Sequence, residues 1–507
     1  MIKAGEEALR SSASREALNY YQEALSLYLN KYGDTADPEK LKMLEKNIGI
    51  AFFNKGEYEN ALTYFDRVLK RWGIKPPQNK ILIRLKLLFD ILKVIPHLYF
   101  PLIKTVRIPD HRDNEIFDLS WKKAQTLTFV DPTRHLLELI GDINKSLGFD
   151  LRKIENGYNW LLGGSGLFSY TGISFKLSNR LLEYAESVID KNNFKEILAF
   201  NVFRLVHNVM AGNWEDIQDY DESLLDHNLK IGQFWEVSIY LNFYVLVKQD
   251  QGEFKVVQQV IKKLSEIADR YEYQLARTFQ LTRETSLFTE YKKLYDAKNN
   301  SEKLELSYIK VGSDPYQLIH LGYKAHIQLL LKDFVEAEKS LIQAEEWYGK
   351  QAFVPPPYAT PYLYAKFSFD MELLEESILS NNKSKISKLR KNACKSGKNA
   401  LKNSKKYAVY RTAVFKLTGL YYWLINKQNK AVKWWKRAIE EGERLGARPD
   451  LARTYVEIGK RFLEEKSKYK ELNGISTKEY LEKARTMFQE MDLQWDLDEL
   501  DKLASDS

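Results

Sequence analysis

Residues that could carry out catalysis are few and scattered in this 507-residue sequence. The glycine-rich stretch GGSGLFSYTG (163–172) could hold an anion through its backbone amides. It lacks the Gly-Lys-Ser/Thr ending of a phosphate-binding loop, however, and no strand is evident before it. We therefore interpret it as a flexible crossing between two helices.

Histidine and cysteine residues offer no clear site either. Of the seven histidines, only His320 and His326 are close, and a spacing of six places them on different faces of a helix. Cys394 is surrounded by lysines but has no evident histidine partner, which favours a small structural residue over a nucleophile. We expect no catalytic residue, no cofactor and no metal ligand, and hence no enzymatic activity.

A basic segment (381–406) is the strongest charge feature of the chain. It carries ten Lys or Arg residues and no acid, whereas the net charge of the whole chain is +8. Four of its cations form a candidate basic patch that would attract nucleic acid, an acidic partner or an anionic surface: Lys388, Arg390, Lys391 and Lys395.

The alternative for this segment is a helix that leaves its lysines in water. An apolar stripe would then pack inward, consisting of Ile386, Leu389, Ala393 and Leu401. No aromatic residues are interleaved for base stacking, so we favour the solvated face and keep nucleic-acid binding as the secondary alternative.

The elements that carry these residues are predicted to be helices arranged in repeats. The stretch LEKNIGIAFFNKGEYENALTYFDRVLKRWG (44–73) has the tetratricopeptide (TPR) pattern, with Ala61, Phe65 and Val68 on its second helix. The small alanine lets two helices touch, and the aromatic residue four positions later fills the groove between them. When the N-terminal stretch is aligned with this repeat at an offset of 44 residues, Gly5 aligns with Gly49 and Tyr21 aligns with Phe65. The first repeat would then need residues before Met1, so we expect the chain to begin inside a helix.

The same pattern recurs towards the C-terminus. It is marked by Ala431, Trp435 and Ala438; by Thr477, Leu481 and Ala484; and by Ala337, Leu341 and Ala344. Counting back from Ala337 in steps of 40 residues reaches Ala297, Val257 and Ile217, which predicts a period of about 40 residues. Ser476 and Glu479 form a capping box, and Asp-Pro pairs at 37–38, 131–132 and 314–315 mark further helix starts.

The predicted fold is all-α: a TPR-like α-solenoid, a right-handed superhelix of helix pairs without a sheet. We divide it into N-terminal TPR-like repeats (1–100), divergent helical repeats (101–380) and C-terminal TPR-like repeats (381–507) that include the basic helix. Longer breaks are expected at 72–80, 101–115, 159–172 and 353–361. Low proline and glycine contents, 13 and 24 residues, agree with long helices.

Composition also bears on location. The single cysteine excludes an intramolecular disulfide and suits a reducing cytosol, and the first residues lack the apolar core of a signal peptide. The most apolar span (83–103) contains Arg84, Lys86, Asp90, Lys93 and His97, which disfavour insertion in a membrane. We expect a cytoplasmic protein.

Repeat geometry predicts a candidate binding groove on the concave wall. Trp423 directly follows Tyr422, which occupies the interior position of the helix, so its side chain is expected to point into the groove. Lys416 would lie on the same wall of the groove, and Arg453 and Lys460 on the next wall. A basic groove with an aromatic residue suits an extended acidic peptide or a partner helix. The alternative is a wall that is polar because water fills the groove.

The repeats resemble a known family. LTGLYYWLINKQNKAVKWWKRAIEEGERLGARPDLARTYVEIGKRFLEE (417–465) and YLEKARTMFQEMDLQWDLDEL (480–500) are similar to the C-terminal TPR region of large bacterial signalling ATPases. Members couple an AAA-like or STAND-type nucleotide-binding module, often behind a class III adenylate or guanylate cyclase domain, to a TPR solenoid. The segments ALNYYQEALSLY (17–28) and FVPPPYATPYLYAKFSFDMELLEESI (353–378) are similar in order and spacing.

The resemblance implies recognition without turnover. No Walker motif and no paired cyclase aspartates occur, so no catalytic residue of the family has a counterpart here. It implies a non-catalytic scaffold or sensor that binds a protein or peptide, the partner being an ATPase or nucleotide cyclase module or a small signalling peptide. A regulatory fragment of a split multidomain ATPase is the alternative.

Overall fold

The computed structural model describes residues 1–10, 13–74, 89–90, 92–94, 96, 107–311, 314–351 and 353–505. The described chain is all-α except for a small hairpin, β1 (Glu471–Leu472) and β2 (Ile475–Ser476), and one isolated bridge between Arg107 and Phe149. The expectation of no sheet is therefore wrong at this hairpin, which lengthens the connection between two C-terminal helices.

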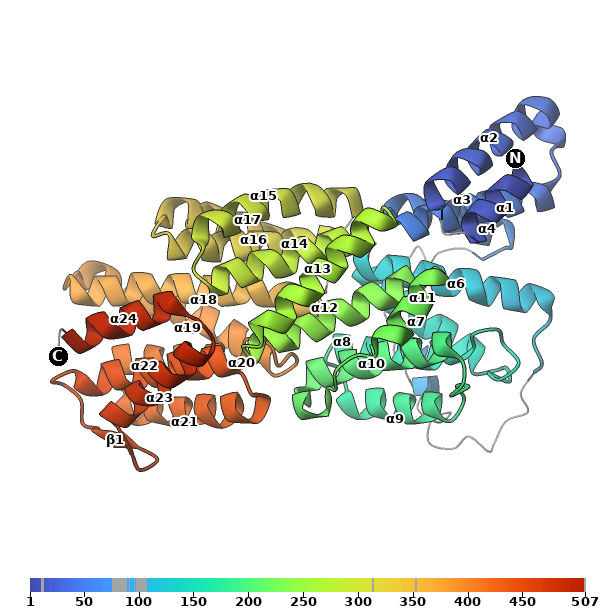
Figure 1. Cartoon of the computed structure of the whole chain (residues 1–507). Helices are drawn as coiled ribbons and strands as arrows, with labels where there is room; N and C mark the ends of the chain where they lie inside the picture. The colour runs from blue at the N-terminus through green and yellow to red at the C-terminus, as the bar shows by residue number, and fades with distance from the viewer. Residues whose placement is uncertain are drawn as a thin grey trace.

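The helices keep the labels of Figure 1. In chain order they are α1 (Ile2–Arg10), α2 (Ser14–Tyr32), η1 (Gly33–Thr35), α3 (Pro38–Lys55), α4 (Tyr58–Arg71), α6 (His111–Val130), α7 (Pro132–Ser146), α8 (Tyr158–Tyr170), α9 (Phe175–Glu186), α10 (Phe194–Ala211), η3 (Trp214–Asp216), α11 (Glu222–Lys230), α12 (Phe234–Asp250), α13 (Phe254–Arg270), α14 (Gln274–Glu290), α15 (Leu294–Val311), α16 (Asp314–Leu330), α17 (Phe334–Lys350), α18 (Pro356–Leu379), α19 (Lys383–Ser404), α20 (Arg411–Leu424), α21 (Gln428–Leu445), α22 (Arg448–Leu463), α23 (Thr477–Glu490) and α24 (Gln494–Ser505). Consecutive helices pack against one another along most of the chain.

The 40-residue period is present in the middle of the chain. Helices α10, α12, α14 and α16 begin at residues 194, 234, 274 and 314, and α13, α15 and α17 begin at 254, 294 and 334. Ala337, Ala297 and Val257 are fully buried on the second helix of their pairs. The step to Ile217 is wrong, because this residue follows the short helix η3 and lies outside any long helix.

Glycine and aromatic residues lock the terminal helix pairs as the repeat pattern predicts. A Cβ atom added at Gly49 would lie 2.8 Å from the Phe65 ring, and one added at Gly419 would lie 2.3 Å from the Trp435 ring. Phe65 and Trp435 are both fully buried. Only a residue without a side chain permits this approach, which explains why the pattern pairs a glycine with a large aromatic residue.

Local helix starts are also confirmed. Asp37 and Asp131 accept hydrogen bonds from backbone amides at the first turns of α3 and α7, each with a proline at the first helical position. Ser476 and Glu479 form the predicted capping box at the start of α23. Helices α6 and α18 begin earlier than expected, so the breaks around residues 101–115 and 353–361 are shorter than predicted.

The glycine-rich stretch is a buried helix, which contradicts its interpretation as a flexible crossing. It forms most of α8. A Cβ atom at Gly163 would lie 2.6 Å from the Trp121 ring, and one at Gly166 would lie 2.7 Å from the Phe203 ring. The glycines therefore allow large aromatic residues of α6 and α10 to reach the backbone of α8, and their amides are engaged in a helix.

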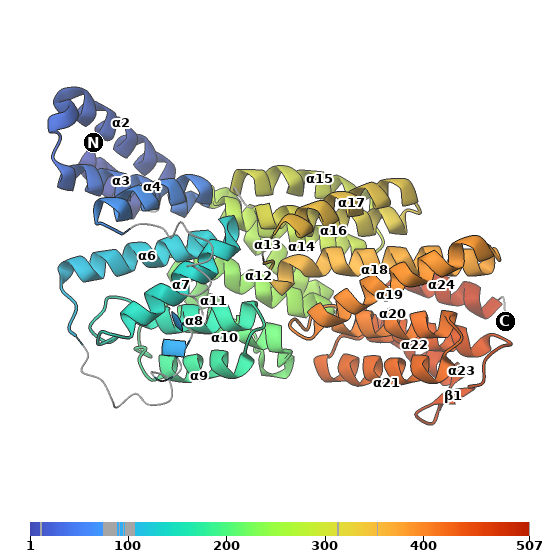
Figure 2. The ribbon, with the colours of Figure 1, turned by 180° about the vertical axis from the view of Figure 1, so that it is seen from behind.

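Segments distant in sequence meet because the helical array curls back on itself (Figures 1 and 2). The hydroxyl groups of Tyr58 and Tyr273 are 2.6 Å apart, the Tyr358 hydroxyl donates to the Thr128 carbonyl at 3.2 Å, and Arg444 donates to the Gly212 carbonyl at 2.7 Å. Helices α1–α4 project at one end, and α19–α24 form the other end.

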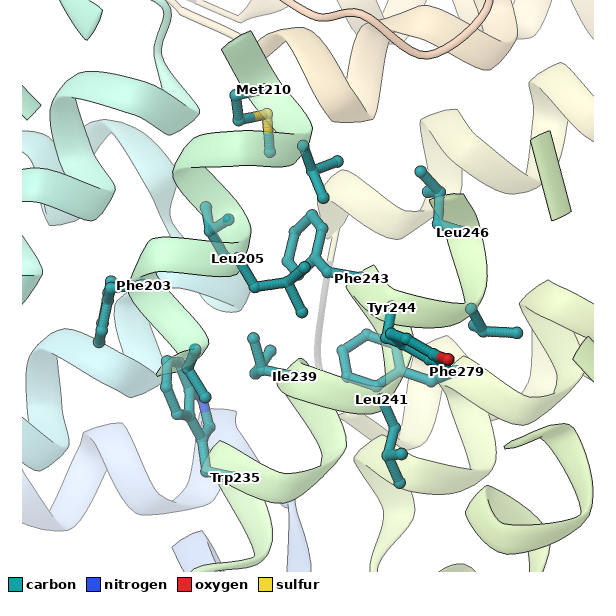
Figure 3. Packing of buried hydrophobic residues seen from close by; sticks show 14 of the residues in the cluster. Phe203, Leu205, Met210, Trp235, Ile239, Leu241, Phe243, Tyr244, Leu246 and Phe279 are labelled. Carbon is teal, nitrogen blue, oxygen red and sulfur yellow. The ribbon is translucent and has the colours of Figure 1, made fainter. Parts of the chain in front are cut away.

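Helix α12 shows the consequence for the interior. Its buried residues occupy all sides of the helix, as expected for a helix enclosed by others. Its aromatic and aliphatic side chains interlock with those of α10 and α14 (Figure 3). The space between α10, α12 and α14 is therefore filled by packed side chains at this level.

No helix in the described part of the chain is long and apolar enough to cross a membrane. The span 83–103, judged from its sequence to be a poor membrane span, lies largely outside the described residues.

Candidate functional site

Two of the four predicted groove residues meet in a cavity. Lys416 of α20 and Arg453 of α22 line a space of about 320 Å³ between the ends of α12 and α14 and the helices α16, α18, α20, α22 and α24. Lys460 is exposed and does not line this cavity. Other residues that line the cavity include Asp250, Glu290, Lys292, His326, Tyr364, Tyr410, Asp450, Glu457, Trp495, Asp496 and Glu499.

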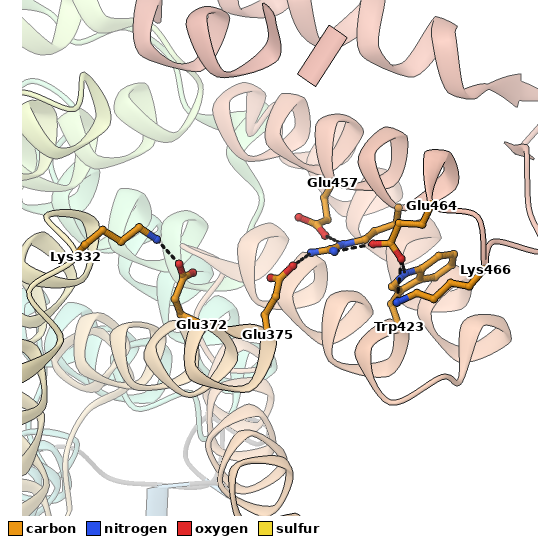
Figure 4. A network of polar contacts seen from close by, with 8 residues as sticks. Lys332, Glu372, Glu375, Trp423, Glu457, Glu464 and Lys466 are labelled. Carbon is orange, nitrogen blue, oxygen red and sulfur yellow. Dashed lines mark hydrogen bonds and ion pairs between the residues drawn. The ribbon is translucent and has the colours of Figure 1, made fainter. Parts of the chain in front are cut away.

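Trp423 does not face a groove, and the expectation that it does is wrong. Only 1% of its surface is exposed, and its ring centroid lies 5.4 Å from that of Trp435 and 6.1 Å from that of Phe462. Its indole Nε1 donates to Glu464 at 2.9 Å (Figure 4). Helix α20 packs against α19, α21 and α22, which leaves no open face for this side chain.

Glu464 belongs to a buried ionic network that fixes the C-terminal helices. Arg461, which is 4% exposed, pairs with Glu375 of α18 at 2.5 Å, with Glu457 at 2.6 Å and with Glu464 at 2.8 Å (Figure 4). Because every donor group of Arg461 has a carboxylate partner, the network is satisfied within the protein. Its role is structural.

Arg453 is the anchor of the cavity. Its guanidinium makes two hydrogen bonds to Asp496 of α24, both at 2.9 Å, and a third to the Glu290 carboxylate of α14 at 2.7 Å. Burial disfavours its charge, but Asp496 and Glu290 more than compensate and raise the pKa of Arg453 well above its usual value. This forked contact joins α22 and α24 to α14, whose Glu290 lies 163 residues before Arg453.

Two other cations of the cavity have no such partner. Among the described residues, no carboxylate lies within 4.0 Å of the ammonium of Lys292 or Lys416. Burial, and then the nearby charges of Arg453 and Lys416, lower the pKa of Lys292 to about 8. Its ammonium lies 5.4 Å from the ring centroid of Trp495, which is 45% exposed at the cavity.

Two carboxyl groups are unpaired as well. Asp250 ends α12 and Asp450 lies in the first turn of α22, and neither forms an ion pair with a described residue. Burial, followed by repulsion from Asp450 and Glu290, raises the pKa of Asp250 well above its usual value. Burial and the Glu290 charge also raise the pKa of Asp450. The charges of Lys416 and Arg453 act on Asp450 in the opposite direction, and those of Glu290 and Asp496 do so on Lys292. The unpaired groups thus lie among charges of both signs.

Aromatic and imidazole groups complete the wall. Burial lowers the pKa of His326 to about 3, so the ring is neutral, and its buried Nδ1 has no hydrogen-bond partner among the described residues. The rings of Tyr364 and Tyr410 lie 4.8 Å apart. Tyr410 has a φ of 62°, a left-handed conformation that is costly for a bulky residue and tends to occur at functional positions.

Sequence reasoning missed Asp250, Glu290, Lys292 and Asp496, although a signal was present. Asp250 and Glu290 are 40 residues apart, one repeat, and each is the last residue of its helix. A carboxylate at a helix C-terminus meets the negative end of the helix dipole, so local preference disfavours it. Two successive violations of this preference indicate a demand from the tertiary structure.

The predicted basic patch is exposed on α19. Lys388, Arg390, Lys391 and Lys395 face solvent, and none of the ten cations of residues 381–406 forms an ion pair with a described residue. The predicted inward stripe is confirmed, because Ala393 is buried and the three other stripe residues pack against a core of α18 and α20.

A second cavity, of about 90 Å³, lies among α6, α8, α10 and α12. Its walls are almost entirely apolar and include Trp121, Phe203, Trp235 and Phe243. Burial lowers the pKa of His135 in its wall to about 4, so this group is neutral as well. A cavity without charged side chains has little means of orienting a polar ligand.

In the described residues, no group of three or more His, Cys, Asp or Glu side chains is placed to hold a metal ion. Comparisons of the sequence with protein-family models and with curated proteins find no match.

Proposed function

We propose that the protein is a non-catalytic scaffold or sensor that recognises a protein or peptide partner, in signalling linked to an ATPase or nucleotide cyclase. The observation that supports this proposal is the charged cavity. There, Lys292, Lys416, Asp250 and Asp450 are held without ion-pair partners by helices from the middle and the C-terminal part of the chain. Half-buried charges without ion-pair partners are costly, and such groups are concentrated at sites that bind something.

The helical framework suits recognition. Repeated helix pairs offer extended surfaces to protein partners, and a cavity at the junction of several helix ends can accept a charged group from a partner. Arg453, Asp496 and Glu290 hold the walls together, so the unpaired groups are positioned before a partner arrives. Such preorganisation lowers the entropic cost of binding.

The test compares partner capture by matched charge reversals. Lys416→Glu alters the cavity, whereas Lys460→Glu introduces the same charge change at an exposed position of α22. We expect a specific partner to be retained by wild type and Lys460→Glu and lost from folded Lys416→Glu. Loss from both variants, or from neither, would contradict recognition at the cavity.

A turnover assay tests the absence of catalysis separately. The purified chain should hydrolyse neither ATP nor GTP and should form no cyclic nucleotide. Turnover that disappears in Asp450→Asn would overturn the proposal and convert the cavity into an active site, since perturbed carboxyl and amino groups are also features of catalytic centres.

Binding of nucleic acid or of an acidic surface through α19 is a second candidate function. It is favoured by the ten cations of residues 381–406, which have no ion-pair partner among the described residues. Affinity should then fall steeply with salt and decrease on neutralisation to Gln of Lys388, Arg390, Lys391 and Lys395. The control with an equal charge change is neutralisation of four lysines at the start of α21: Lys427, Lys430, Lys433 and Lys436. Equal affinity of the two variants, or no binding at low salt, would remove this candidate.

A further inference from the structure

The unpaired groups of the charged cavity are of both signs: Lys292 and Lys416 carry ammonium groups, and Asp250 and Asp450 carry carboxyl groups. Asp250 lies close enough to Asp450 and Glu290 for their charges to disfavour its ionisation, and Lys292 is affected in the same way by Arg453 and Lys416. Opposite charges also act on these groups, Lys416 on Asp450 and Glu290 on Lys292, but none of the four groups has an ion-pair partner within 4.0 Å among the described residues. A ligand that carried both charges would supply a close partner to the acids and to the lysines together.

Simpler ligands fit this wall less well. Six carboxyl groups line the cavity against three cationic side chains, so a polyanion such as a nucleotide would meet repulsion. A simple cation would leave Lys292 and Lys416 without partners, and a simple anion would do the same to Asp250 and Asp450. The arrangement favours a dipolar ligand.

The size of the cavity and its aromatic residues narrow the class further. A volume of about 320 Å³ lies at the lower end of the range of about 300–1,000 Å³ for small-molecule sites. Trp495, Tyr364 and Tyr410 offer ring faces beside the charged groups. Rings in these positions can contact the apolar or cationic part of a small ligand.

We propose that this cavity binds a small zwitterion of the free amino acid or dipeptide class, with its carboxylate at Lys292 and Lys416 and its ammonium at Asp250 and Asp450. The inference deepens the proposed recognition function by giving the cavity a small-molecule ligand. Arg453 and Asp496 position the walls and do not contact the ligand's charges, because they are already paired with each other.

The experiment is a binding screen on the full chain by thermal shift and calorimetry. The probes are the individual L-amino acids, alanyl-alanine, succinate as a dicarboxylate without an amine, and putrescine as a diamine without a carboxylate. We expect at least one amino acid or the dipeptide to raise the melting temperature and to give a saturable heat signal. A preference for the amino acids or for the dipeptide shows which of these two kinds of zwitterion the cavity binds.

Three variants locate the site. Lys416→Met and Asp450→Asn should each weaken binding by about tenfold to a hundredfold, the effect of losing a hydrogen bond to a charged group. Lys460→Met, at the exposed position of α22, should bind like wild type. Circular dichroism of each variant checks that it is folded.

Three results would overturn the inference. They are no response to any amino acid or to the dipeptide, equal binding of succinate or putrescine, and binding that is unchanged in both cavity variants. These results would leave the proposed function standing if Lys416→Glu still loses a captured protein partner, so the two failures can be told apart.

Discussion

The apolar and charged cavities differ in which parts of the helices form them. The walls of the apolar cavity come largely from within helices, at Trp121, Phe203 and Phe243, whereas part of the charged cavity's wall comes from helix ends and their flanks, at Asp250, Glu290 and Tyr410. Side chains within helices have their backbone polar groups satisfied and can pack tightly. Helix ends, by contrast, bring several polar groups to the wall of the same cavity. From this difference we expect stability to depend mainly on the first region, and we propose the second as the binding region.

The largest expected effect is in the apolar region. Phe203→Ala should destabilise the protein by about 3–5 kcal/mol, the usual cost of removing a buried phenylalanine side chain. The ring contacts α8 at Gly166 and lies between Trp121 and Trp235, so its loss leaves a void. Urea unfolding measures the change. Phe194→Ala on the same helix, where the ring is 46% exposed, should cost about 1 kcal/mol or less. Equal losses at the two positions would contradict the assignment of stability to this region.

A somewhat smaller loss is expected when the charged cavity loses its anchor. Arg453→Met leaves Asp496 and Glu290 without their partner and should cost about 3 kcal/mol, at the low end for a buried pair because the cavity is open to water. Arg448→Met on the same helix removes an exposed pair with Glu490 and should cost about 1 kcal/mol or less. Similar unfolding midpoints for the two variants would show that Arg453 does not hold the helices together.

The charged cavity should also give stability a pH dependence that the apolar cavity does not. The pKa of Lys292 is about 8 in the folded chain and 10.5 for an unperturbed lysine, so between these values the unfolded state binds more protons. Stability should therefore rise with pH across this window, by up to about 1.4 kcal/mol per unit of pKa shift. Lys292→Met should abolish the rise, and Lys293→Met, at the exposed neighbouring position, should retain it. A wild-type profile in Lys292→Met would refute the unpaired state of this lysine.

The same reasoning applies to Asp250 with the opposite slope. Its raised pKa means that the folded state binds more protons than the unfolded state above the usual aspartate value of about 4. Stability should fall as pH rises through that window. Asp250→Asn should remove the fall and be about 1 kcal/mol more stable than wild type at pH 7. Lower stability of Asp250→Asn, measured by urea unfolding at pH 7, would show that the carboxylate has a stabilising partner.

The smallest effect on stability is expected on α19. Replacement of Lys388, Arg390, Lys391 and Lys395 by Gln should change unfolding stability by no more than about 0.5 kcal/mol, because these side chains are exposed and unpaired among the described residues. A large loss of unfolding stability would show that these side chains of α19 help to hold the fold together. A negligible loss leaves its charge available for an external partner.

The sequence by itself determined the helices, the residues at which several of them start, and the contact of a glycine with an aromatic residue that joins two helices into a pair. Gly49 with Phe65 and Gly419 with Trp435 could be found because a close helix contact demands a small residue opposite a large one at a fixed spacing. The 40-residue period and the inward stripe of α19 followed from the same periodicity. These features depend on neighbours within a repeat, so a linear pattern contains them.

Only the tertiary structure decided where the repeats meet. The burial of Trp423, the helical state of residues 158–170 and the meeting of Lys416 and Arg453 with Asp250 and Lys292 depend on how the array curls back on itself. That arrangement depends on the way in which many successive helices pack against one another over hundreds of residues. No single repeat encodes this arrangement, so contacts such as Arg453 with Glu290 cannot be inferred from spacing along the chain.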